Sequence, residues 1–232
     1  MKVLGLIPAR GGSKGIPRKN LKALAGKPLV CYTIEAALQS SLLDTVIVST
    51  EDAEIAAVSR RTGAEVPFLR PAELAADSAP TIDTVVHALQ FYESRGKTFD
   101  AICLLQPTTP FRTAEDIDLA IRQFKDREAD CLISVRPVPH QYNPHWIFEP
   151  EGDGYLRLAT GEEQIIPRRQ ELPPAYYRDG AIYLTRWAIL RDERTLYGKK
   201  ITYCVLEQSP EINIDTPADW ANAERLINQR IA

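Results

Sequence analysis

Positive charge and glycine gather near the start of the chain, in residues 7–20 (IPARGGSKGIPRKN). This stretch contains Arg10, Lys14, Arg18 and Lys19 and no acidic residue, although the whole chain has a formal net charge of -3. Its glycines let backbone N–H groups approach an anion, and its arginines and lysines neutralise the negative charge. The stretch fits neither the P-loop pattern nor the dinucleotide-binding glycine pattern. It predicts a phosphate-binding loop of another kind, with a solvated basic turn as the alternative.

The elements that must position this loop alternate between buried strands and amphipathic helices. An apolar run at 2–9 leads directly into the loop, and ligands in open α/β sheets collect at such carboxyl ends of strands. Alternation of this kind predicts an α/β, Rossmann-like layered fold with a mostly parallel central sheet. We predict strands at 2–9, 44–50, 99–107 and 129–138 and helices at 28–40, 52–63, 81–96 and 113–127. Regular patterns return at 181–186 and 200–207, before a closing helix at 216–230.

Residues 137–179 interrupt the alternation with many prolines and aromatic residues. A long excursion inside an α/β domain is usually functional. We therefore expect a single domain over residues 1–232, with 137–179 as a proline- and aromatic-rich excursion for dimerisation or substrate binding.

Composition excludes several classes of protein. A pI near 5.7 argues against a general nucleic-acid surface, so the predicted anion site is local. The chain has no apolar stretch long enough to span a bilayer, and its N-terminus turns basic too soon for a signal peptide. The four cysteines are scattered within apolar runs, which favours reduced core thiols. We expect a cytoplasmic protein without nucleic-acid or membrane partners.

Several blocks of the sequence resemble those of the acylneuraminate cytidylyltransferases, the CMP-sialic acid synthetases. The blocks follow the family's order over nearly the whole chain. They read LIPARGGSKGIPRKNL, VIVSTEDAEIA, LRPAELAADSAPT, LLQPTTPFRT, RRQELPPAYYRDGAIYL and INIDTPADW. The resemblance implies attack by the anomeric hydroxyl of a 2-keto sugar acid on the α-phosphate of CTP, which gives a CMP-sugar and pyrophosphate. Relatives that activate the eight-carbon acid Kdo have a different opening loop, so the nine-carbon, sialic-acid type is favoured.

The resemblance also implies a nucleotide site. Arg10 and the backbone that follows it cradle the phosphates, and Lys19 lies near the bond that breaks. Asn20 lies beside the α-phosphate or the attacking hydroxyl, and Arg70 donates to the O2 and N3 atoms of cytosine. The full set of nucleotide-binding candidates is Ala9, Arg10, Gly11, Gly12, Ser13, Lys19, Asn20, Arg70, Ser78 and Thr81.

The sugar acid needs partners for its hydroxyls and its carboxylate. Gln106 follows a predicted buried strand and is a candidate for the hydroxyls. Arg169 matches the family arginine near the carboxylate, as expected from the affinity of Arg for carboxylates. Gln170, beside it, and Tyr176 complete the predicted sugar site. Tyr176 is a candidate for the pocket edge and, equally, for an interface.

Triphosphate chemistry requires Mg²⁺, which prefers oxygen ligands. The family commonly has two aspartates where this chain reads INIDTP, so the implied ligands are Asn213 and Asp215. Asp215 joins Arg10, Lys19 and Asn20 as a catalytic candidate. The same stretch also fits a helix start, with Asp215 or Thr216 as the N-cap.

Other functions remain open at this point. The enzyme could be a cytidylyltransferase for another 2-keto sugar acid such as Kdo, or a nucleotidylyltransferase for another base or an ordinary sugar phosphate. The loss of one aspartate at Asn213 also leaves open a non-catalytic nucleotide-sugar-binding protein. By the resemblance, the protein is expected to be a homodimer.

Overall fold

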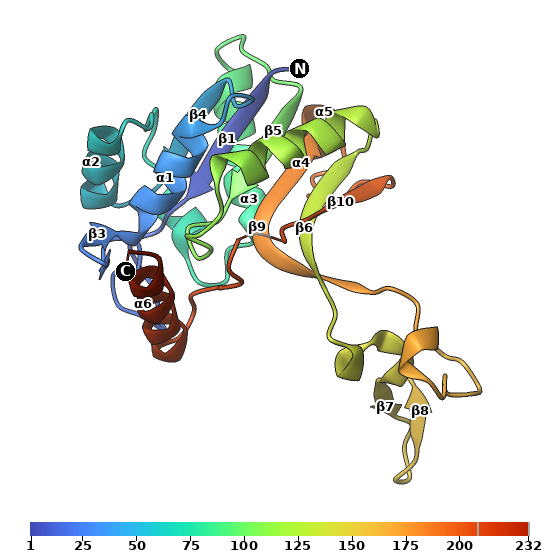
Figure 1. Cartoon of the computed structure of the whole chain (residues 1–232). Coiled ribbons are helices and arrows are strands. Elements are labelled where there is room, and N and C mark those ends of the chain that lie inside the picture. Colours follow the sequence, from blue (N-terminus) through green and yellow to red (C-terminus); the bar gives the residue numbers. More distant parts are fainter. Residues whose placement is uncertain (208, 232) are drawn as a thin grey trace. The chain divides into compact units, whose positions relative to one another are not determined.

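A six-stranded sheet forms the centre of the larger of two compact units, which comprises Met1–Ser134 and Asp179–Ala232. The computed structural model describes residues 1–207 and 209–231. The strand order is β10-β6-β9-β5-β1-β4 (Figure 1). The strands are β1 (Val3–Pro8), β4 (Thr45–Ser49), β5 (Ala101–Leu105), β6 (Cys131–Pro137), β9 (Tyr176–Arg186) and β10 (Ile201–Val205). β1 pairs in parallel with β4 and β5, whereas β9 runs antiparallel to β5. The predicted α/β fold with a mostly parallel sheet is confirmed.

Helices cover both faces of the sheet. Alternate residues of β1 point to opposite faces, so Val3 and Ile7 pack with α1, α2 and α4, while Leu4 and Leu6 pack with α3 and α5. The helices are α1 (Leu29–Gln39), α2 (Ala53–Thr62), α3 (Thr81–Glu93), α4 (Ala114–Asp126), α5 (Trp187–Asp192) and α6 (Pro217–Ile231). α5 and the short hairpin of β2 (Ala23–Leu24) and β3 (Lys27–Pro28) were not predicted.

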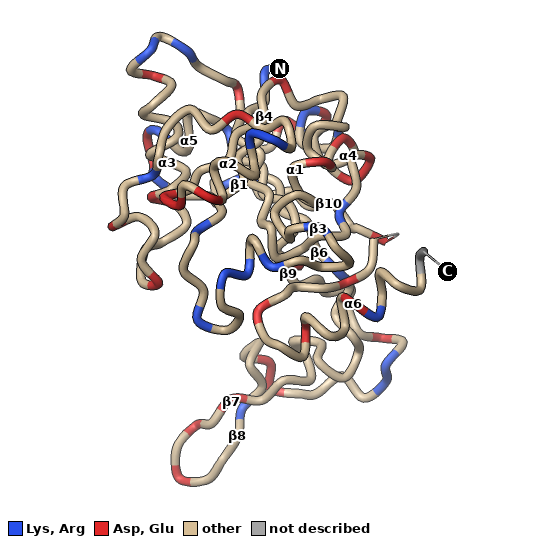
Figure 2. Tube along the Cα trace, turned by 90° about the vertical axis from the view of Figure 1, so that its left-hand side faces the viewer, with Lys and Arg blue, Asp and Glu red and all other residues tan. Residues whose placement is uncertain are grey.

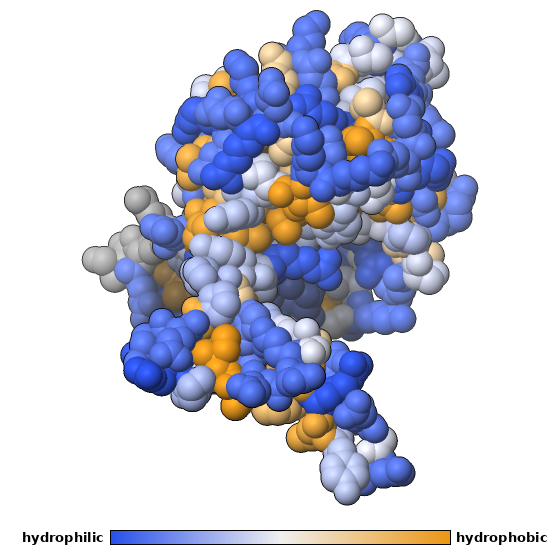
Figure 3. Space-filling view, turned by 90° about the vertical axis from the view of Figure 1, so that its right-hand side faces the viewer, coloured by the Kyte–Doolittle hydropathy of each residue, from blue (hydrophilic) through white to orange (hydrophobic). Residues whose placement is uncertain are grey.

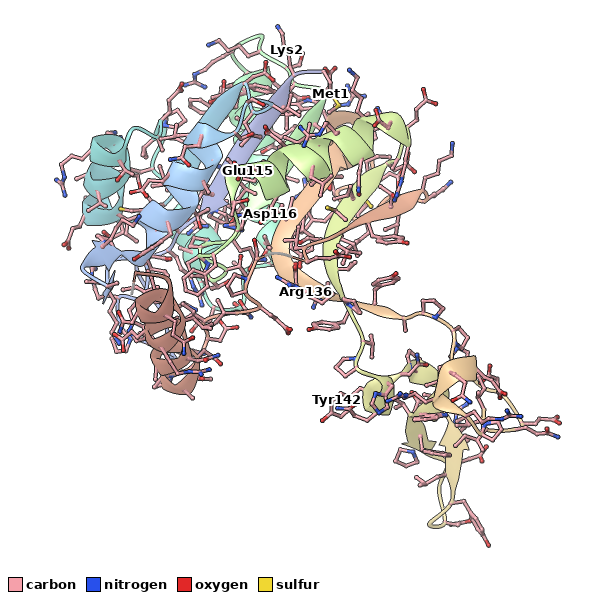
Figure 4. The ribbon with its side chains drawn as sticks, viewed as in Figure 1. Met1, Lys2, Glu115, Asp116, Arg136 and Tyr142 are labelled. Carbon is pink, nitrogen blue, oxygen red and sulfur yellow. The ribbon has the colours of Figure 1, made fainter. Side chains whose placement is uncertain are left out.

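Local sequence signals set the helix ends. Asp52 caps α2 by accepting from the amides of Glu54 and Ile55, and Gly63 ends that helix at φ 104°. α4 begins with a capping box between Thr113 and Asp116. Figure 4 shows Glu115 and Asp116 at this end of α4.

The four cysteines are all buried and free, which confirms the predicted core thiols. Burial raises the pKa of Cys103, in β5, to about 12. Basic and acidic residues are interspersed along the trace (Figure 2). No helix among residues 1–207 and 209–231 has the length and apolar character that a bilayer crossing needs.

The smaller unit spans Val135–Arg178 and covers most of the expected excursion. It holds a hairpin of β7 (Phe148–Pro150) and β8 (Leu156–Leu158). It also holds the single-turn helices η2 (His140–Tyr142), η3 (Pro144–Trp146) and η4 (Arg169–Glu171). The Asn143 side chain donates to the carbonyl of Pro173, and the Trp146 indole donates to that of Ile166. Several large apolar side chains are exposed, and small hydrophobic patches interrupt a mainly hydrophilic surface (Figure 3).

Candidate functional site

A cavity of about 300 Å³ opens where β1 and β5 end, at the carboxyl edge of the sheet. Its walls are the loop after β1, the segment around the start of α3, the loop after β5 and Asp215 before α6. Ligands of open α/β sheets bind at this edge. The predicted site residues that line the cavity are Arg10, Gly12, Ser13, Lys19, Asn20, Arg70, Thr81, Gln106 and Asp215.

Four predicted residues lie near the cavity without lining it. Ala9 is fully buried, and the amide of Gly11 donates to Oε1 of Glu51 at 2.7 Å. Ser78 is exposed, between η1 (Ala72–Ala75) and α3. Asn213 is exposed and donates from Nδ2 to Oδ2 of Asp215 at 2.8 Å.

The predicted sugar residues Arg169, Gln170 and Tyr176 belong to the smaller unit. Arg169 and Gln170 lie in η4, and Tyr176 begins β9. Their role at a sugar site stays a prediction.

The loop after β1 is shaped by its own hydrogen bonds. The buried Asn20 donates from Nδ2 to the carbonyl of Arg10 at 2.9 Å, which ties the two ends of the loop together. Ile16 anchors the middle by packing into a cluster with Trp220 of α6. A Cβ on Gly15 would lie 2.1 Å from the carbonyl oxygen of Asp215, so a glycine is required there. The loop therefore lies directly against the segment that holds Asp215.

Lys19 joins the same two segments through its side chain. Its Nζ donates to the carbonyl of Ile214 at 2.6 Å and to Oδ1 of Asp215 at 2.9 Å. The lysine side chain is 11% exposed and that of Asp215 is 60% exposed. The backbone N–H of Ile214 donates to the carbonyl of Thr108 at 2.8 Å, so the loop after β5 meets them too.

The start of α6 fixes the backbone of Asp215. Thr216 accepts from the amide of Asp219, and Asp219 accepts from the amides of Thr216 and Asp215. These contacts make Thr216 the N-cap, which decides between the two predicted cap residues. The hydrogen bond from the Thr216 backbone holds the pKa of Asp219 below its ordinary value.

Arg70 is buried and also lines the cavity. Its Nη1 donates to Oγ1 of Thr84 at 3.1 Å, and its Nη2 donates to Oε2 of Glu51 at 3.0 Å. The Arg70 side chain is 4% exposed, and a buried guanidinium requires partners of this kind.

Asp77 provides an acidic partner for the basic loop. It lies 2.7 Å from Nη2 of Arg10 and 2.9 Å from Nζ of Lys14. The hydrogen bond from Lys14, together with the charge of Arg10, lowers the pKa of Asp77. These two cations are arranged to hold negatively charged oxygens, which here come from a carboxylate.

Arg112 holds the loop that carries Gln106. Its guanidinium is buried and donates to the carbonyls of Gln106 and Ala181 and to the hydroxyls of Thr33 and Thr109. Burial lowers its pKa to about 10, so the group remains charged at neutral pH.

Sequence reasoning missed four residues of this site. Glu51 gave a weak signal, since an acidic residue directly after a buried strand falls at the ligand-binding edge. Asp77, Thr84 and Arg112 gave none, because no spacing in the sequence shows which side chains they contact.

Comparisons with known proteins extend over nearly the whole chain. The family model described as "Cytidylyltransferase" matches residues 4–231. A CMP-N,N'-diacetyllegionaminic acid synthase from Legionella pneumophila is 37% identical, over 98% of this chain and 97% of that protein. A pseudaminic acid cytidylyltransferase from Campylobacter jejuni is 32% identical, over 97% and 96%.

Two further comparisons concern a longer relative and a solved structure. An N-acylneuraminate cytidylyltransferase from Escherichia coli is 32% identical, over 94% of this chain and 50% of that protein. A CMP:2-keto-3-deoxy-manno-octonic acid synthetase solved with CTP superimposes with a TM-score of 0.75 at 20% identity, covering 99% of this chain and 100% of that one. At that identity the superposition supports the predicted Rossmann-like fold alone.

The matched family, the full-length relatives and the cavity at the sheet edge agree with one another. They confirm the resemblance that the sequence blocks carry, and with it the predicted class of enzyme, a nucleotidyltransferase. The chain belongs to the cytidylyltransferase family, among the CMP-nonulosonate synthetases.

Proposed function

We propose that this protein transfers CMP from CTP to the anomeric hydroxyl of a nine-carbon 2-keto sugar acid and releases pyrophosphate. The observation that carries the proposal is the shared cavity of Arg10, Lys19, Arg70 and Asp215. It combines cations for a triphosphate, a buried guanidinium for a base and a carboxylate at one sheet edge. The names of the relatives make a legionaminic acid the first substrate to test, followed by pseudaminic and sialic acids.

Each side chain then has a chemical task. Arg10 and Lys19 stabilise charge on the phosphates, and Asn20 keeps the loop in place while it faces the reacting phosphate. Arg70 donates to cytosine, which presents acceptors where uracil presents a donor at N3. Gln106, which lines the cavity, takes the hydroxyls of the sugar acid. The assignment of Arg169, Gln170 and Tyr176 to the sugar acid rests on the sequence resemblance.

The residues at this site suit a Mg²⁺ ion that binds together with the nucleotide. Among the described residues, no group of three or more His, Cys, Asp or Glu side chains could hold a metal. Asp215 and Asn213 still offer oxygens, and Mg²⁺ is usually held by one or two carboxylates together with substrate phosphates. When bound, the ion neutralises charge on the triphosphate.

A homodimer in the cytoplasm completes the proposal. The exposed apolar side chains of the smaller unit, such as Tyr142, Phe148 and Tyr155, support an interface there. Figure 4 shows Tyr142 in that unit. Light scattering of the purified protein tests the dimer, and a monomer at micromolar concentration contradicts it.

The decisive experiment measures pyrophosphate release with CTP and Mg²⁺ over a panel of legionaminate, pseudaminate, N-acetylneuraminate and Kdo. ATP, GTP and UTP serve as nucleotide controls. We expect release with CTP and one nine-carbon acid. Release with Kdo alone moves the substrate to the eight-carbon class, and CTP binding without release with any acid favours a non-catalytic binding protein.

A further inference from the structure

One carboxylate connects the basic loop to Arg70. Glu51 follows β4, and its Oε1 accepts from the backbone N–H of Gly11 at 2.7 Å. Its Oε2 accepts from Nη2 of Arg70 at 3.0 Å. Gly11 lies in the basic loop and Arg70 lines the cavity, so a single side chain holds both. Glu51 itself is 22% exposed and does not line the cavity.

Arg70 depends on this carboxylate for its orientation. The guanidinium has two fixed donors, one to Thr84 and one to Glu51. Within the part of the chain that the structure describes, its buried Nε has no hydrogen-bond partner. Thr84 contributes a neutral hydroxyl, so Glu51 supplies the negative charge that a buried guanidinium needs.

We infer that Glu51 is a positioning residue that sets the base-reading guanidinium at a fixed distance from the phosphate-binding loop. The inference rests on the proposed function, since it takes Arg70 as the group that reads cytosine. Glu51 keeps Arg70 and the basic loop at a fixed separation. A small displacement of a binding group removes much of its contribution to affinity. Selectivity for CTP over UTP is therefore set partly by a residue outside the cavity.

Only a glutamate satisfies both donors at this position. A glutamine has one acceptor oxygen, and its NH₂ group faces either the Gly11 amide or Arg70, donor against donor. An aspartate keeps the charge but is one methylene shorter, so it cannot reach both partners. If Glu51 merely neutralised Arg70, aspartate would restore function.

The test measures nucleotide binding by calorimetry, with CTP and UTP separately and no sugar acid. The variants are Glu51→Gln and Glu51→Asp. Glu54→Gln is the matched control, because Glu54 is 69% exposed, pairs with Arg18 and lies outside the cavity. For both Glu51 variants we expect the Kd of CTP to rise about tenfold, the loss of roughly one charged hydrogen bond. The Kd ratio of UTP to CTP falls toward one, and the control matches wild type.

Thermal unfolding of each variant separates positioning from folding. A lower melting temperature with an unchanged UTP-to-CTP ratio in the folded protein means a structural role and overturns the inference. Full recovery of CTP binding by Glu51→Asp overturns the inference as well. If Glu51→Gln does not fold, the result for Glu51→Asp decides the test. A wild-type protein that binds UTP as tightly as CTP contradicts the proposed function itself. If the inference alone fails, the wild-type protein prefers CTP and the Glu51 variants keep that preference.

Discussion

The ammonium of Lys19 lies 2.9 Å from Oδ1 of Asp215, across 196 positions of sequence. The same carboxylate accepts from Asn213 through its other oxygen. The basic loop and the segment before α6 thus meet at one side chain, where the proposed mechanism needs both a cation and a metal ligand.

Replacing Lys19 with methionine removes the cation and keeps most of the side chain's volume. We expect turnover with CTP and the sugar acid to fall about 100-fold, the usual effect of losing one group that stabilises transition-state charge. Pyrophosphate release measures it. The control is Lys22→Met, which removes a lysine that packs over the ring of Trp220 outside the cavity. Equal activity of the two variants contradicts the role of Lys19.

Asn213→Asp adds a second carboxylate beside Asp215. More ligand charge tightens the binding of a hard cation, so we expect the Mg²⁺ concentration for half-maximal rate to fall about tenfold. A Mg²⁺ titration of pyrophosphate release gives this value, with Asn222→Asp in α6 as the control. No change in Mg²⁺ dependence argues against a metal at this position.

Gly15 and Gly12 differ in the space around them, although both belong to the same loop. A Cβ on Gly15 meets the Asp215 carbonyl oxygen at 2.1 Å, whereas a Cβ on Gly12 meets nothing within 4 Å. We expect Gly15→Ala to push the loop away from Asp215 and to lower turnover about 100-fold. Gly12→Ala meets no protein atom and should unfold at the wild-type temperature, whereas Gly15→Ala should unfold at a lower one, so equal melting temperatures of the two variants would refute the assigned contact.

Arg112→Met removes the four hydrogen bonds that a buried guanidinium donates, to the carbonyls of Gln106 and Ala181 and to two threonine hydroxyls. Each unsatisfied buried group is costly, so we expect the free energy of unfolding to fall by about 3 kcal/mol or more. Urea unfolding measures it, with the exposed Arg191 replaced by methionine as the control, expected to change stability by less than about 0.5 kcal/mol. If Arg112→Met lowered the free energy of unfolding by no more than this control does, the loop after β5 would be stable without the hydrogen bonds of Arg112.

Asp118 predicts a pH dependence of stability. Burial by itself raises its pKa, but hydrogen bonds from Ser40 and Ser41 outweigh burial and leave the pKa below its ordinary value. A carboxyl whose pKa is lower in the folded state stabilises the protein above its unfolded pKa, near 4, and this contribution disappears as the pH falls through the folded pKa. We expect Asp118→Asn to unfold more easily at pH 7 and to lose less stability between about pH 5 and pH 2.

The control for this prediction is Asp126→Asn, an exposed position in the same helix. Urea unfolding at several pH values should give wild-type pH dependence for it. Parallel curves of stability against pH for Asp118→Asn and wild type would show that the contacts with Ser40 and Ser41 do not shift the pKa of Asp118.

The sequence by itself determined the alternation of strands and helices and the place of the basic, glycine-rich loop at the end of β1. An apolar run that ends in glycines and cations is a local signal, and so is Gly63, whose positive φ ends α2 where the pattern predicted. The short α5 was missed because six residues carry too little periodicity to be recognised. The family blocks added the substrate class, which no periodicity contains.

The tertiary structure alone decided which side chains hold the site together. Glu51 reaches Gly11 and Arg70, Lys19 reaches Asp215, and no spacing in the sequence announces either contact. The physical reason is that the sheet brings the ends of distant strands to one edge, where partners are chosen by distance and charge in space. A carboxylate on the surface and one that fixes a buried guanidinium look alike in a sequence, and only burial and geometry separate them.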